Sequence, residues 1–201
     1  MNERTVKIER ETRETKIRGT LSLDGERKIS VDTGIGFLDH MLSTLAFHAG
    51  WDLELDCRGD LEVDDHHTAE DCALAVGDAI SRALGDRAGI ARFGSAYAPL
   101  DEALARAVID LSGRPWPEVD LGMKREKVGA LACENLSHVM TSLAMSMKAA
   151  VHVDVIRGDN DHHRAEAAFK ALALALRAAT ARVDDGDVPS TKGTLGRDGA
   201  A

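Results

Sequence analysis

Hydrophobic and charged residues alternate clearly at 51–58, where Trp51, Leu53, Leu55 and Cys57 are separated by Asp, Glu and Asp. A period of two is typical of a β-strand with one face in the core and one in solvent. Three further segments have an extended, alternating character and are predicted to form strands. The predicted strands are 17–23, 51–58, 103–111 and 151–155.

Longer stretches rich in alanine and leucine follow these strands and have the length of helices. The first of the two longest ends before Gly85, a residue typical of helix C-termini. Helices are predicted at 37–48, 66–84, 133–147 and 162–182. Each half therefore has strands, a helix, a strand and a helix. This order indicates an α+β fold in which helices cover one face of a sheet.

The two halves of the chain resemble each other in sequence. The segment 38–46 aligns with 136–144, and the Arg-Gly-Asp sequence at 58–60 recurs at 157–159. A single long spacing between the copies indicates two large units rather than many short repeats. We therefore predict an internal duplication with a first half-repeat at 1–90, a second at 91–182, and a C-terminal tail at 183–201 that substrate orders in part.

Composition and charge exclude several classes of protein. The chain has 201 residues, of which 44% are hydrophobic and 29% charged, as expected for a folded globular protein. Its formal net charge of −9 argues against nucleic acid or an anionic membrane as a partner. Three cysteines without C-x-x-C spacing indicate neither a disulfide framework nor a thiolate zinc site. With no apolar leader or membrane span in the sequence, a cytoplasmic location is expected.

The most informative motif occurs twice, as Asp-His-His-Thr-Ala-Glu at 65–70 and Asp-His-His-Arg-Ala-Glu at 161–166. On a helix, the first His and the Glu of each copy are four residues apart and share a face. Imidazole and carboxylate together suit a divalent transition metal. A simpler interpretation, an Asp-capped helix with surface histidines, explains one copy but not two at matching positions.

Two further histidines, at matching positions on predicted helices of the two halves, complete the set of candidate metal ligands. His40 and His138 bring the total to six histidines and two glutamates, enough for two centres of three imidazoles and one carboxylate each. His152 is predicted to be a solvated strand residue, whereas His48 has either a capping or an active-site role. Arginines at 92 and 114 and the Pro-Ser-Thr-Lys-Gly sequence at 189–193 are candidate anion clamps.

Five ordered motifs resemble those of the imidazoleglycerol-phosphate dehydratase family. They lie at 33–42, 65–71, 110–115, 161–170 and 189–193, and the resemblance spans about residues 5–195. The resemblance implies dehydration of imidazole glycerol phosphate to imidazole acetol phosphate in L-histidine biosynthesis. It further implies two Mn²⁺ per active site and a duplicated fold like ribosomal protein S5 domain 2. The implied assembly is a homo-oligomer of twenty-four subunits with active sites at their interfaces.

The same resemblance implies roles for individual residues. Eight are implied metal ligands: His40, His66, His67, Glu70, His138, His162, His163 and Glu166. Six are implied substrate contacts, chiefly to phosphate: Glu14, Arg92, Arg114, Lys170, Ser190 and Lys192. Two positions depart from the family pattern, because Thr44 replaces a usual Gln and Ser137 a common acidic residue. The first departure puts one direct substrate contact in doubt.

Loss of water from the substrate needs groups that move protons, and Glu14, Glu166 and His48 are the candidates. Two other functions use similar residues, a dinuclear metal hydrolase and a metal-storage or sensing protein. The hydrolase is usually richer in Asp, and the storage protein leaves the anion clamps unexplained. Because the two histidines of each pair diverge, we expect ligands from the first half of one chain to meet ligands from the second half of a neighbour.

Overall fold

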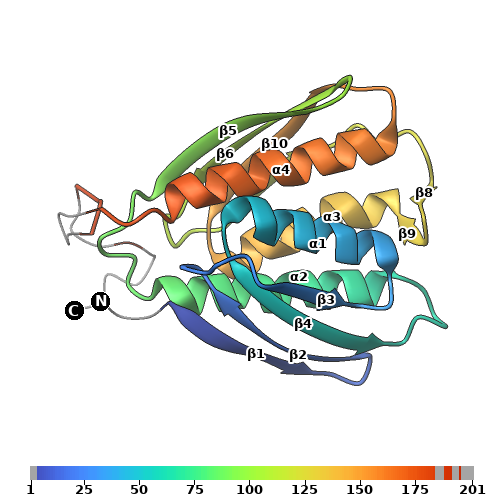
Figure 1. The fold of residues 1–201 in the computed structure, drawn as a ribbon, viewed down its shortest axis with the longest axis horizontal. Helices are drawn as coiled ribbons and strands as arrows, with labels where there is room; N and C mark the ends of the chain where they lie inside the picture. The colour runs from blue at the N-terminus through green and yellow to red at the C-terminus, as the bar shows by residue number, and fades with distance from the viewer. Residues whose placement is uncertain (1–3, 184–187, 192–194, 196–201) are drawn as a thin grey trace.

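The computed structural model describes residues 4–183, 188–191 and 195. Two four-stranded sheets form the outer layers of the molecule, and four helices lie between them (Figure 1). The first half contributes β1 (Thr5–Glu11), β2 (Thr15–Ser22), β3 (Ile29–Asp32), α1 (Gly36–Ala49), β4 (Asp52–Gly59) and α2 (His66–Leu84). The second half contributes β5 (Phe93–Leu100), β6 (Ala103–Asp110), β7 (Trp116–Asp120), β8 (Lys127–Val128), β9 (Leu131–Ala132), α3 (Cys133–Met147), β10 (Ala150–Arg157) and α4 (Asp161–Ala179).

The two halves have the same topology, which confirms the α+β fold with a duplicated unit. Strand order is β1-β2-β4-β3 in one sheet and β5-β6-β10-β7 in the other. In both sheets the last strand of that order runs parallel to its neighbour, while the other pairs are antiparallel. The β8–β9 hairpin is the exception, because it occurs in the second half alone among the described elements.

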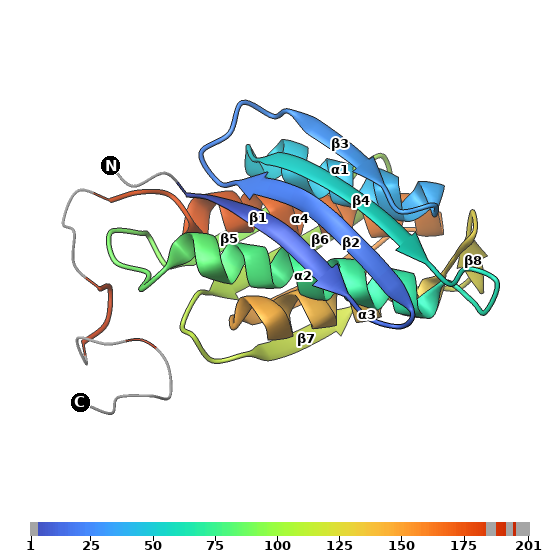
Figure 2. The same cartoon turned by 90° about the horizontal axis from the view of Figure 1, so that it is seen from below.

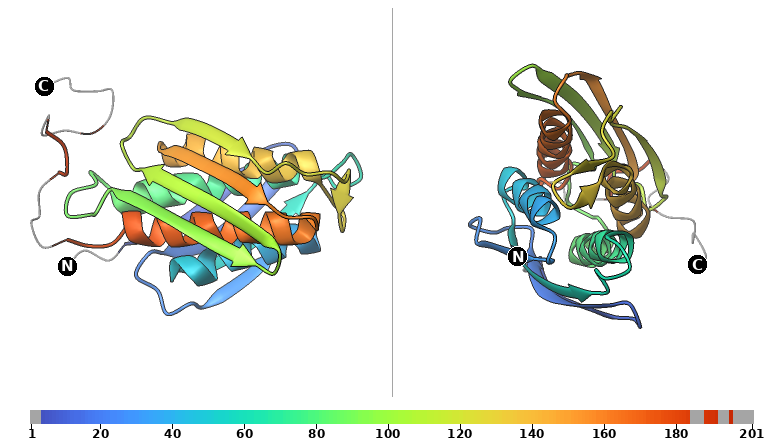
Figure 3. Two further views of the ribbon diagram at one scale, coloured as in Figure 1. Left: turned by 90° about the horizontal axis from the view of Figure 1, so that it is seen from above. Right: turned by 90° about the vertical axis from the view of Figure 1, so that its right-hand side faces the viewer.

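One face of each sheet lies against the helices (Figures 2 and 3), and the buried apolar side chains of the strands alternate with exposed ones. On β4, Leu53, Leu55 and Cys57 are buried, whereas Glu54 and Asp56 are exposed. The structure therefore confirms the alternation of buried and exposed residues that the sequence predicted at 51–58. With only 3% aromatic residues, alanine and leucine fill most of the core, and the small side chains let helices and sheets approach closely.

The predicted helices agree with the structure except at one end. Helix α3 covers the predicted residues, α2 ends at Gly85 as expected, and α1 is one residue longer at each end. The prediction of helix up to residue 182 was wrong, because α4 ends at Ala179. There the chain leaves the helix and Arg182 forms a β-bridge with Ile90. In the described part of the chain, no helix has both the length and the apolarity to cross a membrane.

Candidate metal centres

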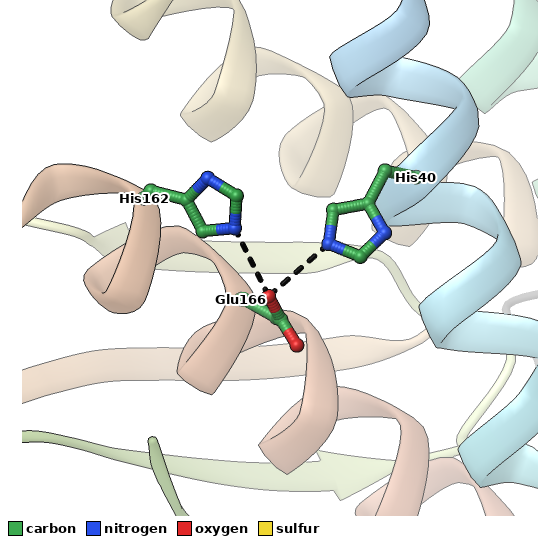
Figure 4. A group of neighbouring side chains, drawn as sticks. All are labelled: His40, His162 and Glu166. Carbon is green, nitrogen blue, oxygen red and sulfur yellow. Dashed lines mark hydrogen bonds and ion pairs between the residues drawn. The ribbon is translucent and has the colours of Figure 1, made fainter. Parts of the chain in front are cut away.

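The first centre lies between α1 and α4, two helices from different halves that pack side by side. His40 comes from α1, while His162 and Glu166 occupy successive turns of α4 (Figure 4). The Nε2 atoms of both imidazoles lie 3.1 Å from the same oxygen, Oε2 of Glu166. Two imidazole nitrogens and a carboxylate oxygen thus converge on one point, as the ligands of a divalent metal must.

The second centre has the same design between α2 and α3. Nε2 of His66 lies 3.6 Å from Glu70 Oε2, and Nε2 of His138 lies 3.4 Å from Glu70 Oε1. Nδ1 of His66 is 2.9 Å from the side-chain oxygen of Asn135, which orients the ring. Nε2 of His138 is buried and makes no hydrogen bond, so this nitrogen has its coordinating position free. The donor set and this orphaned nitrogen fit a bound cation.

Both centres combine the two halves of a single chain. His40 of the first half meets His162 and Glu166 of the second, and the other centre likewise unites the halves. We expected ligands from the first half of one chain to meet ligands from the second half of a neighbour, whereas for these six residues the two halves already meet within one chain. The physical reason is that α1 packs on α4 and α2 on α3 within the helical layer.

The second histidine of each pair points away from both centres. Nδ1 of His67 lies 3.0 Å from Asp60, and Nδ1 of His163 lies 2.7 Å from Glu102. These carboxylates raise the pKa of each imidazole, because hydrogen bonding to the ring favours its charged form. The predicted divergence within each His-His pair is therefore present, and neither His67 nor His163 reaches a centre in its own chain.

Glu166 is held in its ionised form. Its burial opposes charge, but Lys170 Nζ lies 2.8 Å from Oε1 and the imidazole of His40 faces the other oxygen. These partners outweigh burial and lower the pKa of Glu166 to about 2. The carboxylate is therefore an anion at neutral pH, ready to bind a cation.

A cavity of about 410 Å³ lies beside α1 and is lined in part by Thr44 and His48. His40, Thr44 and His48 are spaced by four residues and share one face of α1. Burial, together with the charge of Lys170, lowers the pKa of His48 and favours the neutral ring. Thr44, the position at which the resemblance led us to expect Gln, lines this cavity.

Arg92, a predicted phosphate contact, lies at the other end of α4. The backbone N–H of Arg92 donates to the carbonyl of Ala179, the last residue of that helix. The Arg92 side chain makes two hydrogen bonds to Asp110 and donates to the carbonyl of Pro189, next to Ser190. Lys192 lies outside the described residues.

Arg114 lies in an exposed turn after β6, three residues beyond Leu111. The N–H of Leu111 donates to the carbonyl of Arg92, which brings the two chain segments together. Helical rise separates Ala179 from His162 by roughly 25 Å. Within one chain, Arg92 and Arg114 are therefore far from the metal centre. Among the predicted substrate contacts that the structure describes, Lys170 and Glu14 lie near the histidines or their carboxylate.

Sequence reasoning missed three carboxylates and one amide around the histidines. Asp60, Asp101, Glu102 and Asn135 all lie next to an imidazole. The repeated Arg-Gly-Asp sequence could have indicated Asp60, since repeats mark shared functional positions. The other three come from turns and helix positions that the alignment of the halves did not include.

Comparisons with known proteins identify the family of this chain. Residues 33–176 match the family model for imidazoleglycerol-phosphate dehydratase. A relative of that name from Neurospora crassa is 56% identical, covering 92% of this chain and 93% of its own, and one from Saccharomyces cerevisiae is 50% identical, covering 97% and 100%. Crystal structures of such enzymes from Staphylococcus aureus and Pyrococcus furiosus both give a TM-score of 0.81. They are 34% and 36% identical and cover 89% and 94% of this chain, with 99% and 100% of their own length.

Proposed function

Because the chain belongs to the imidazoleglycerol-phosphate dehydratase family, we propose that its two histidine–carboxylate centres hold the metal ions used in that reaction. The chain is a hydro-lyase that dehydrates imidazole glycerol phosphate in histidine biosynthesis. Membership of this family favours the dehydratase over the two other functions considered from the sequence, the metal hydrolase and the metal-storage protein. The convergence of two imidazoles and one carboxylate in each centre is the observation that carries the metal proposal.

The proposed metal is Mn²⁺, with two ions per active site. Each centre offers three ligands from one chain, and a fourth is proposed to come from a neighbouring copy. His67 and His163 are the candidates, because both diverge from the centres of their own chain. Their Nε2 atoms lie 3.6 Å from a carboxylate oxygen of Glu14 and 3.8 Å from one of Asp101. Their Nδ1 atoms face Asp60 and Glu102, an arrangement that fixes a metal-binding imidazole by its second nitrogen.

When bound, two divalent cations supply Lewis acidity that stabilises negative charge on the imidazole ring of the substrate. The residues of the chain then have to move protons, because hydroxide must leave C3 as water and the C2 proton must be removed. Glu14 suits this work better than Glu166. Its carboxylate is about half exposed and 3.6 Å from His67, whereas Glu166 is held by two imidazoles and Lys170. His48, kept neutral beside Lys170, is the proposed second proton carrier.

The phosphate of the substrate is proposed to bind Arg92, Arg114, Ser190 and Lys192 from a different copy of the chain. Roughly 25 Å of α4 separates Arg92 from the metal ligands at the helix N-terminus. A molecule as small as imidazole glycerol phosphate therefore cannot contact Arg92 and the metal ligands of the same chain at once. The proposed assembly is therefore a homo-oligomer, a 24-mer in the family pattern, with each site shared between copies.

The test is product formation from imidazole glycerol phosphate by protein stripped with a chelator. Activity should be lost on stripping and return with Mn²⁺, and should not return with a matched concentration of Ca²⁺, which prefers oxygen ligands. Release of inorganic phosphate, measured in parallel, reports any hydrolase activity. Undiminished turnover by protein shown to be free of metal would contradict the proposal.

A further inference from the structure

Asp71 is a buried carboxylate in α2, directly after the proposed metal ligand Glu70, and the metal centres do not use it. Its Oδ1 accepts two hydrogen bonds from the guanidinium of Arg10, from Nε at 2.9 Å and Nη2 at 2.6 Å. Its Oδ2 accepts from the hydroxyl of Thr15 at 2.5 Å and from that of Thr12 at 3.4 Å. Both carboxylate oxygens are therefore tied to the β1–β2 hairpin.

These partners surround the turn that carries Glu14. The hydroxyl of Thr12 accepts hydrogen bonds from the backbone N–H groups of Glu14 and Thr15, at 3.1 and 3.0 Å. The N–H of Thr12 donates to the carbonyl of Thr15 at 2.9 Å, which closes the turn. The backbone around Glu14 is thus held through Thr12 and Thr15, and both of these hydroxyls are held by Asp71.

Helix α2 also carries the group that Glu14 faces. Oε1 of Glu14 lies 3.6 Å from Nε2 of His67, and the Glu14 carbonyl accepts a hydrogen bond from the N–H of Asp60. His67 and Asp71 are four residues apart on this helix. One rigid element therefore sets the position of the histidine and the position of the turn that faces it.

The second half of the chain shows that the fold does not require this network. Ala167 occupies the position after Glu166 that corresponds to Asp71. The corresponding turn between β5 and β6 is held instead by Glu102, whose Oε1 accepts from the N–H groups of Asp159 and Asn160. Because the same unit forms without a buried carboxylate at this position, the network in the first half serves something specific to that half.

We infer that Asp71 is a positioning residue for Glu14, acting through Thr12 and Thr15. This inference rests on the proposed function, in which Glu14 moves a proton of the substrate. A misplacement of the acting group by about 1 Å lowers turnover by as much as ~100-fold, whereas binding through other residues is little affected. Loss of the network should therefore lower kcat while leaving KM and metal content nearly unchanged.

Thr12 provides the sharpest test because it is exposed and its replacement leaves the core intact. Thr12→Val should lower kcat by about 10- to 100-fold with KM nearly unchanged, while Thr12→Ser should retain the parental kcat. Thr5→Val is the matched control, since its hydroxyl lies at the opposite end of the same hairpin. Asp71→Asn should follow Thr12→Val, with folding checked by circular dichroism.

A double-mutant cycle with Glu14→Gln separates positioning from general destabilisation. If Thr12 acts through Glu14, the variant carrying Thr12→Val and Glu14→Gln should be no slower than Glu14→Gln alone. Additive losses, or an unchanged kcat in Thr12→Val, would overturn the inference while leaving the proposed function intact. An unchanged kcat in Glu14→Gln itself would remove the proposed role of Glu14, and the inference with it.

Discussion

At the scale of single residues, each metal centre depends on a carboxylate shared by two imidazoles. Glu166 and Glu70 both stand between a histidine four residues earlier on their own helix and a histidine from another helix. Removing one imidazole leaves two of the three donors that one chain supplies. A divalent ion then loses both affinity and the geometry that selects it.

We predict that His66→Ala halves the metal bound per chain, because it disables the α2–α3 centre and leaves the α1–α4 centre intact. His152→Ala is the matched control, since His152 is exposed on β10 and belongs to neither centre. The measurement is the metal content of each variant after dialysis, determined by elemental analysis. Equal metal content in the two variants would exclude His66 as a ligand.

At the scale of elements, close packing of α2 on α3 brings the second centre together. A Cβ on Gly77 would lie 2.6 Å from the carbonyl oxygen of Leu143 and 2.9 Å from Cβ of Ser146. Gly→Ala within a helix gains about 1 kcal/mol in propensity, whereas overpacking a tight contact costs ~1–3 kcal/mol. Because a backbone oxygen cannot rotate away, the cost of overpacking should exceed the gain in helix propensity.

Gly77→Ala is therefore predicted to lower the urea midpoint of unfolding and to weaken metal binding at the α2–α3 centre. Gly36→Ala is the control, because a Cβ at the start of α1 meets no atom within 4 Å. It should leave stability unchanged or slightly raise it. Both variants have to be compared with the parent at one protein concentration. A higher urea midpoint for Gly77→Ala than for the parent would contradict the prediction, because it would show that α2 and α3 can move apart at little cost.

A second element-scale prediction concerns Asp24, which lies in the connection after β2 and binds one arginine before β1 and another after α4. It is bound by Arg4 before β1, and Nη2 of Arg182 after α4 lies 2.8 Å from Oδ2. Hydrogen bonding to Arg4, against some burial, lowers the pKa of Asp24 from 3.8 to about 2. A depressed folded-state pKa means that the stabilisation is complete above pH ~4 and is lost as pH falls toward 2.

Asp24→Asn should thus lower the free energy of unfolding at pH 7 by at most ~1 kcal/mol, because the carboxylate is 40% exposed and screened by water. The difference from the parent should shrink as pH falls below 4. Urea titrations at pH 7, 4 and 3 measure this trend, and a difference independent of pH would assign the effect to lost packing instead of charge.

At the scale of the whole molecule, the two ends of the helical layer carry different chemistry. The metal ligands lie near the helix N-termini. Arg92 is hydrogen-bonded to Ala179 at the end where α4 stops, and Arg114 follows Leu111, which is hydrogen-bonded to Arg92. If copies of the chain share each site, two differently inactivated variants can complement each other. A site with metal ligands from one copy and phosphate contacts from another is then intact.

We predict that His162→Ala and Arg114→Ala are each nearly inactive alone but regain activity when dissociated together and reassembled with Mn²⁺. Mixing His162→Ala with Glu166→Gln is the control, because both lack the α1–α4 centre and no intact combination exists. Native mass spectrometry confirms that mixed assemblies have formed. Mixed assemblies with no more activity than the separate variants would place each site within one chain.

The sequence by itself determined the elements and their inventory of ligands. Alternation on β4, the lengths of α2 and α3 and the repeated Asp-His-His motifs are local patterns, and local periodicity is set by backbone geometry. The divergence of His67 from His66 also follows from helical spacing alone. For these features no long-range contact had to be known.

Only the tertiary structure decided which ligands meet. His40 joins His162 and Glu166 because α1 packs on α4, and sequence periodicity does not specify which helix packs against which. The same holds for Asp71 and the turn at Glu14, which are 57 residues apart in the printed sequence. Contacts between distant segments depend on how the two sheets and the helical layer share one core, so the composition of each centre is a property of the packed molecule.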